Sequence, residues 1–146
     1  MTTTTTQVYI SGPRLPNIGM NTYFEEVENH PRMELVYDWR SDLVGHSQYM
    51  LEEQSQKMVN GVKKCESLVA IFIPYPSTYR HTFAEIAMAL ALKKKVFIID
   101  ASNSRLYYNV RGNRLYYNFP LFYHPKIRQI KHVYEILNVE FNRINV

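Results

Sequence analysis

The segment from Ser67 to Asp100 constrains the fold of this chain more than any other part of the sequence. It opens with an apolar, partly β-branched run, Leu68 to Ile73, which is typical of a strand buried on both faces of a sheet. A second run of this kind, Val96 to Ile99, ends the segment. Between the two runs lie apolar residues at helical spacing: Phe83, Ile86, Ala87 and Leu90. Two buried strands joined by one helix predict a right-handed βαβ unit in a parallel sheet.

The turn between the first strand and the helix of this unit is where the sequence predicts a functional site. In open α/β sheets, ligands bind beyond the carboxyl ends of the strands, and the turn from Pro74 to Thr82 lies at that edge. Glu85 follows in what we expect to be the first helical turn, where the helix dipole favours an ionised carboxylate. Glu85 is therefore the first candidate for a catalytic residue.

The composition is that of an ordinary globular protein with a mild preference for anionic partners. The chain has 146 residues, and we expect it to fold as one domain over its whole length. A formal charge of +4 and a pI of about 9.1 favour anions such as phosphates, although the charges are scattered along the sequence.

Cysteine use and hydropathy indicate the compartment. The single cysteine, Cys65, excludes an internal disulfide and fits a reducing environment. No run approaches the ~20 apolar residues of a membrane span, and the start, MTTTTTQ, lacks the charged and apolar regions of a signal peptide. We therefore expect a cytoplasmic protein without a membrane partner, whose residues 1–7 are disordered.

Strands and helices alternate in the N-terminal part of the chain. Strands are predicted at Val8 to Ser11 and at Glu34 to Tyr37, and helices from Asn21 or Thr22 to His30 and from Ser47 to Cys65. Together with the unit described above they give the order β-α-β-α-β-α-β. This order predicts a doubly wound parallel α/β sheet.

The C-terminal part has a different, aromatic character. The motif RLYYN occurs at 105–109 and again at 114–118, around a Gly-Asn pair, which predicts either a β-hairpin or a loop over the site. Residues 127–141 carry apolar side chains at helical spacing and predict a closing C-terminal helix.

Two stretches resemble the signatures of a known family. VYISGP, in the first strand, is similar to the opening of the nucleoside 2-deoxyribosyltransferase superfamily, which includes nucleotide N-glycohydrolases. KKCESLVAIFI and TFAEIAMALALKKKVFIID resemble its second signature, in which a buried strand leads to a Gly-Thr-x-x-Glu helix start. The resemblance covers about Val8 to Asp100.

The resemblance implies a flavodoxin-like fold and chemistry at the N-glycosidic bond of a nucleoside or nucleoside 5′-monophosphate, either hydrolysis or transfer. It implies no metal or organic cofactor. Members of the family form homodimers or larger homo-oligomers whose pockets a neighbour completes. The aromatic segment from Tyr107 to Tyr123 is our candidate for that contact.

The nucleophilic glutamate of the family falls on Glu85. A carboxylate beyond a strand end can attack C1′ as the base leaves and can stabilise an oxocarbenium-like transition state. An alternative is purely structural, because Thr82 to Glu85 has the spacing of a capping box. Tyr9 matches the family tyrosine that orients the glutamate, and it is otherwise an ordinary strand tyrosine.

The substrate-binding candidates lie on loops and turns at the same edge of the sheet. Gly12 lets a ligand approach the backbone closely, and Arg14 is placed to meet a 5′-phosphate, or else is a solvated arginine. The remaining candidates have turn or cap roles as their alternatives: Asp38, Ser77, Tyr79, Arg80, His81 and Thr82.

The sequence departs from the family pattern at three positions. His81 stands where a glycine usually precedes the threonine, and Tyr79 stands where transferases carry an aspartate. The aspartate that the family places before the third strand has only Asn60 near its position, and an amide cannot protonate a leaving base. Asp38 or His46 is then the alternative acid. These departures favour a hydrolase or a binding protein over a transferase.

Other classes of function have weaker support. The five histidines are scattered, with no i, i+4 pair for a metal site, and neither G-x-G-x-x-G nor G-K-[ST] is present for a dinucleotide or triphosphate loop. A nucleotide-binding or sensing protein without turnover is the first alternative. A nucleic-acid-binding protein that uses the RLYYN motifs for stacking is the second.

Overall fold

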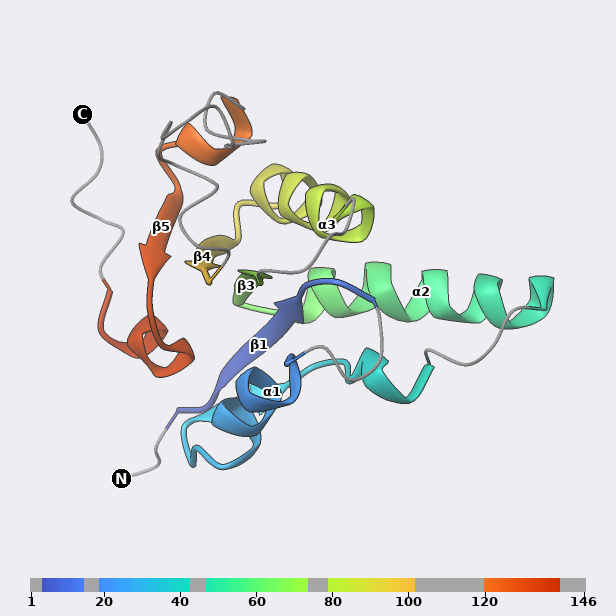
Figure 1. Cartoon of the computed structure of the whole chain (residues 1–146), viewed down its shortest axis with the longest axis horizontal. Coiled ribbons are helices and arrows are strands. Elements are labelled where there is room, and N and C mark those ends of the chain that lie inside the picture. The colour runs from blue at the N-terminus through green and yellow to red at the C-terminus, as the bar shows by residue number, and fades with distance from the viewer. Residues whose placement is uncertain (1–3, 15–18, 43–46, 74–78, 102–119, 140–146) are drawn as a thin grey trace.

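Five parallel strands form the centre of the computed structural model, which describes residues 4–14, 19–42, 47–73, 79–101 and 120–139 (Figure 1). The strand order is β2-β1-β3-β4-β5, and every neighbouring pair is parallel. The bounds are β1 Thr6–Ser11, β2 Met33–Leu35, β3 Ser67–Phe72, β4 Lys95–Asp100 and β5 Ile127–Ile130. This is the order of flavodoxin-like, doubly wound sheets, so the predicted fold class is confirmed.

Helices cover both faces of the sheet. Helices α2 (Gln48–Lys64) and α3 (Arg80–Ala91) pack on one face, whereas α1 (Asn21–Glu28) and the 3-10 helix η3 (Val133–Leu137) pack together on the other (Figure 1). Two further 3-10 helices are η1 (Trp39–Asp42) and η2 (Pro120–Tyr123). Within the described residues, no helix is long and apolar enough to cross a membrane.

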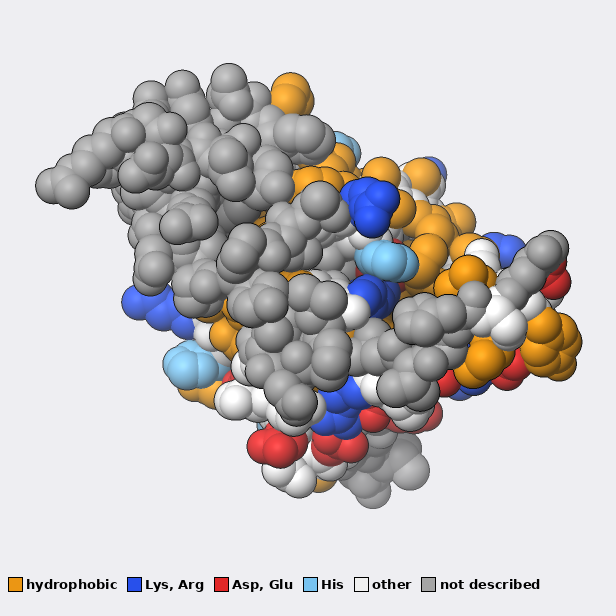
Figure 2. Space-filling view, turned by 45° about the vertical axis from the view of Figure 1, so that its right-hand side comes forward, with side chains coloured by type: hydrophobic (Ala, Val, Ile, Leu, Met, Phe, Trp, Pro, Cys, Tyr) orange, Lys and Arg blue, Asp and Glu red, His pale blue; other side chains and the backbone are white. Residues whose placement is uncertain are grey.

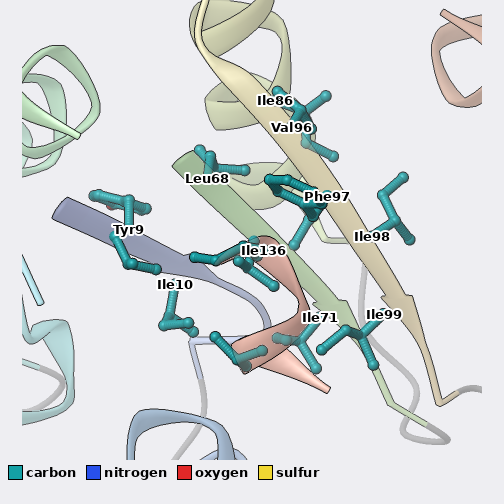
Figure 3. Packing of buried hydrophobic residues seen from close by; sticks show 14 of the residues in the cluster. Tyr9, Ile10, Leu68, Ile71, Ile86, Val96, Phe97, Ile98, Ile99 and Ile136 are labelled. Atoms are coloured by element: carbon teal, nitrogen blue, oxygen red, sulfur yellow. The ribbon is translucent and has the colours of Figure 1, made fainter. Parts of the chain in front are cut away.

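The core lies on both faces of the three central strands. Every residue of β3 is buried, as its apolar run predicts. Tyr9 of β1 is in register with Leu68 of β3, which is in register with Val96 of β4, so these three side chains share the face under α2 and α3. Figure 3 shows Tyr9 and Ile10 leaving β1 on opposite sides, as alternation along a strand requires.

The structure corrects two predictions about the ends of the chain. Disorder was predicted for residues 1–7, but Thr6 and Gln7 belong to β1, where they pair with Met33 and Glu34 of β2, and residues 1–3 lie outside the described residues. The neighbouring strand supplies backbone partners that composition alone does not reveal.

The predicted C-terminal helix over residues 127–141 is instead strand β5 followed by η3. The buried positions Ile127, Ile130 and Val133 are three residues apart, which imitates a helical period. Ile127 pairs with Val96 at the edge of the sheet, so sheet pairing overrides the helical pattern. Both RLYYN motifs, and most of the aromatic segment, lie outside the described residues; of that segment, η2 buries Phe122 against Phe72 and Phe83.

Candidate active site

Glu85 is a fully buried carboxylate at the carboxyl edge of the sheet, with 0% of its surface exposed. Helix α3 begins at Arg80, so Glu85 lies in the second helical turn and not in the first, as its position in the sequence had suggested. Tyr79 occupies the N-cap, and the carboxylate accepts hydrogen bonds from side chains outside α3. The capping-box interpretation of Thr82 to Glu85 is therefore wrong.

Strand β1 supplies two of the donors to Glu85. Tyr9 and Ser11 are two residues apart on the strand, so their side chains leave it on the same face, toward α3. The Tyr9 hydroxyl donates to Oε2 of Glu85, and the Ser11 hydroxyl donates to Oε1 at 2.6 Å. Both donors are completely buried, so this part of the site is fixed by the sheet itself.

Arg14, just beyond the end of β1, supplies the third donor. Its Nη2 lies 2.5 Å from Oε2 of Glu85 and 3.2 Å from the Tyr9 hydroxyl, and its Nη1 donates to the Gly12 carbonyl at 2.9 Å. The guanidinium also lies 4.1 Å from the centre of the Trp39 ring, a cation–π contact. Arg14 is the one of these three donors with exposed surface, 13% of its side chain.

The electrostatics of the site follow from its burial. Burial raises the pKa of Glu85, while the Arg14 guanidinium and the hydroxyls of Ser11 and Tyr9 act in the opposite direction. Burial, followed by the negative charge of Glu85, raises the pKa of Tyr9, so Tyr9 stays protonated and acts as a donor. The three donors hold the carboxylate in one orientation, as a nucleophile requires, and the Arg14 guanidinium opposes the effect of burial on its pKa.

The N-terminus of α3 brings several predicted residues near this cluster. Arg80 and His81 are exposed in the first turn of α3. His81 precedes Glu85 by four positions, a spacing that places two side chains on the same face of a helix. Partial desolvation and the charges of Arg14 and Arg80 lower the pKa of His81. Figure 2 shows basic and histidine side chains next to one another on one face of the molecule.

Other predicted residues serve the local structure. The Tyr79 hydroxyl accepts from the backbone N–H of Ile73 at 3.1 Å and donates to its carbonyl at 2.9 Å, while its own backbone is left-handed, with φ of 53°. Thr82 is fully buried, and its hydroxyl has no hydrogen-bond partner in the described part of the chain. A Cβ on Gly12 would lie 2.4 Å from the end of the Met20 side chain, so Met20 takes up the room beside this glycine.

The candidate acids do not join the cluster around Glu85. Asp38 is paired with Arg40, whose hydrogen bonds lower the pKa of that carboxyl, so Asp38 is a poor proton donor at neutral pH. Asn60 is exposed on α2, and both His46 and Ser77 lie outside the described residues. Among the residues that are described, no group of His, Cys, Asp and Glu side chains could hold a metal ion.

Sequence reasoning missed two members of the site. Ser11 could have been found, because it shares a strand face with Tyr9. Trp39 carries no comparable signal in the sequence. Its ring is buried and donates from Nε1 to the Ile10 carbonyl at 2.7 Å. The face of the ring contacts the Arg14 guanidinium.

The comparisons with known proteins concern the fold. No protein-family model matches the sequence, and no curated protein shows significant sequence similarity to it. Among solved structures, the chain is similar to the CMP N-glycosidase BcmB of Clostridium botulinum, with a TM-score of 0.53 and 18% sequence identity. The two proteins share a fold. The match covers 86% of this chain and 88% of that chain, so it includes nearly all of both.

Proposed function

We propose that this protein cleaves the N-glycosidic bond of a nucleoside 5′-monophosphate or nucleoside, with Glu85 as the nucleophile. The observation that carries the proposal is a buried carboxylate at the carboxyl edge of a parallel sheet, held by Tyr9, Ser11 and Arg14. The fold shared with a CMP N-glycosidase supports the same reaction class.

The proposed reaction has two steps. In the first, an oxygen of Glu85 bonds to C1′ while the C1′–N bond breaks; its electron pair leaves with the base, which takes up a proton from solvent. In the second, water attacks C1′, the ester bond to Glu85 breaks, and the water gives up a proton. A second base in the place of water would make the same intermediate a source of transfer.

The neighbouring residues take supporting roles in this proposal. Tyr9 and Ser11 fix the carboxylate, and Arg14, with Arg80 or Ser77, contacts the phosphate or the sugar. His81 and Thr82 are proposed to line the pocket, whereas Gly12 and Tyr79 support its shape through their contacts with Met20 and Ile73. A homodimer in which the aromatic segment from Tyr107 to Tyr123 walls the base completes the proposal, and no cofactor is required.

A nucleotide-binding protein without turnover is the second candidate. It is favoured by the hydrogen bonds that both Glu85 oxygens accept and by the pairing of Asp38 with Arg40, which makes Asp38 a poor proton donor.

The test is release of free base from a panel of ribo- and deoxynucleosides and their 5′-monophosphates, followed by chromatography. Glu85→Gln keeps the size of the side chain and should lower kcat by at least about 1,000-fold. Glu34→Gln, an exposed change on β2, is the matched control and should retain wild-type rates. Wild-type rates in Glu85→Gln would overturn the mechanism. A thermal shift with one nucleotide but no base release from any would favour the binding protein.

A further inference from the structure

The carboxylate of Glu85 is closed off from solvent in this structure, and three side chains donate hydrogen bonds to it. Oε1 accepts from Ser11, and Oε2 accepts from both Tyr9 and Arg14. None of its surface is exposed. An oxygen that attacks C1′ must come within about 3–3.5 Å of that carbon. Because the carboxylate is completely buried, a side chain that covers it has to withdraw before a substrate can come that close.

The three donors differ in their freedom to move. Tyr9 and Ser11 belong to β1, which is paired on both sides, and each has no exposed surface. Arg14 lies beyond the last residue of β1, has 13% of its side chain exposed, and reaches Glu85 through a long flexible side chain. Arg14 is therefore the donor that can withdraw without disturbing the sheet.

Withdrawal of Arg14 needs a replacement for the carboxylate. A buried or half-buried cation that loses its partner is left with an uncompensated charge, which is strongly unfavourable. A phosphate offers a guanidinium the same planar, bidentate recognition as a carboxylate, together with a larger negative charge. A neutral nucleoside has no such group. In this structure the face of the Trp39 ring also contacts the guanidinium, at 4.1 Å from the ring centre.

We propose that Arg14 exchanges partners, from Glu85 as seen here to an anionic group of the substrate, so that the substrate's own phosphate uncovers the nucleophile. This inference rests on the proposed glycosidic activity. It makes Arg14 a specificity-determining residue: the enzyme would discriminate a nucleoside 5′-monophosphate from its nucleoside through access to Glu85 as well as through binding.

The test separates the phosphate from the nucleoside. The kcat for a nucleoside is measured with wild-type protein in the presence and absence of inorganic phosphite, a dianion that supplies the charge without a covalent link. We expect wild-type protein to prefer the 5′-monophosphate by about 100-fold or more in kcat/KM, and added phosphite to raise kcat for the nucleoside by about tenfold. Arg14→Met should lose both the preference and the activation by phosphite.

Three results would count against the inference. A 5′-monophosphate preference that appears only in KM, with no response of the nucleoside reaction to phosphite, would show that the phosphate only adds binding. An Arg14→Met variant that keeps the phosphite response would also overturn it. Arg32→Met, an exposed change directly before β2, is the matched control and is expected to keep that response. No base release by wild-type protein from either substrate would overturn the proposed function, and this inference with it.

Discussion

Two arginine–carboxylate pairs lie side by side in this molecule, and they differ in one decisive respect. Arg14 pairs with Glu85 and Arg40 pairs with Asp38, at 2.5 Å and 2.6 Å. Each guanidinium stacks on an aromatic ring, Arg14 on Trp39 and Arg40 on Phe24, and these two rings contact each other edge to face at 5.1 Å. The Glu85 side chain has no exposed surface, whereas 38% of the Asp38 side chain is exposed.

Burial gives the two pairs opposite electrostatics. Burial raises the pKa of Glu85, whereas the hydrogen bonds from Arg40 lower the pKa of Asp38. Asp38 and Arg40 are two residues apart and form a local pair, but Glu85 and Arg14 are 71 residues apart and meet only in the folded chain. The Arg14–Glu85 pair, which the whole fold assembles in the protein interior, therefore has the burial and the perturbed pKa that are typical of functional sites.

Removing each arginine should break the two pairs with unequal effects on stability. Arg14→Met keeps the stem over Trp39 but leaves Glu85 buried without a cation, and we expect a loss of about 3–5 kcal/mol in the free energy of unfolding at neutral pH. Arg40→Met should lose about 0–1 kcal/mol, because its partners are exposed. Urea denaturation measures both values, and equal losses would contradict the contrast in burial.

The Arg14→Met loss should depend on pH in a defined direction. A folded-state pKa of Glu85 raised above its unfolded value means that stability is greatest at low pH and falls as the pH rises through the window between the two pKa values. Arg14 opposes the rise in the pKa of Glu85, so its removal raises that pKa further. At low pH Glu85 is protonated with or without Arg14, so the destabilisation by Arg14→Met should shrink as the pH falls toward about 4.5. A loss that stays constant from pH 7 down to that value would mean that Glu85 carries no charge that Arg14 compensates.

Two tyrosines sharpen the comparison at the level of single hydroxyls. Tyr9→Phe removes the donor to Glu85, whereas Tyr37→Phe removes a hydroxyl that donates to Asp42 at 2.7 Å. We expect Tyr9→Phe to lower kcat by about 10–100-fold, corresponding to about 1.5–3 kcal/mol for a hydrogen bond to a charged group. Tyr37→Phe should leave kcat within about twofold. Equal effects would contradict the assignment of Tyr9 as the residue that orients the nucleophile.

The smallest effect is expected at the exposed pair. The lowered pKa of Asp38 means that its contribution to stability is present above the unfolded pKa and is lost as the pH falls through the lower folded value. Asp38→Asn should therefore lower the melting temperature slightly at pH 7. The difference from wild type should begin to shrink as the pH falls below about 4 and should vanish below the lowered folded-state pKa. A difference that grows toward low pH would have the wrong sign for this pair.

Local patterns predicted the central part of the fold well. The apolar runs at 68–73 and 96–99 became β3 and β4, and the helical period between them became α3. The helix predicted over residues 127–141 was wrong, because a short edge strand with buried Ile127 and Ile130 has the same spacing as a helix. Only the pairing with β4 distinguishes the strand from a helix, and that pairing cannot be predicted from the local sequence.

The candidate site was predictable only in part. Glu85 was predicted from its place after a buried strand and from the family resemblance, and Tyr9 was predicted from the resemblance alone. The structure brings the two side chains together. Arg14 was predicted to face a phosphate, but in this structure it contacts Glu85. The contact could not be predicted, because the two residues are 71 positions apart and no local pattern links them. The start of α3 was also predicted about one turn too late. The helix begins at Arg80, after Tyr79 in a left-handed backbone conformation, which is uncommon for tyrosine and could not be predicted from its residue type.

The most direct test of the central claim is the mass of the Glu85 peptide after reaction. A 2′-fluoro nucleoside 5′-monophosphate is suited to this, because the fluorine destabilises the oxocarbenium-like transition state of hydrolysis and lets a glycosyl ester persist. After an acid quench and proteolysis, we predict that the peptide containing Glu85 carries the mass of the sugar phosphate, and that no adduct forms in Glu85→Gln. Base release with Glu85 unmodified, or an adduct on a different residue, would contradict the account.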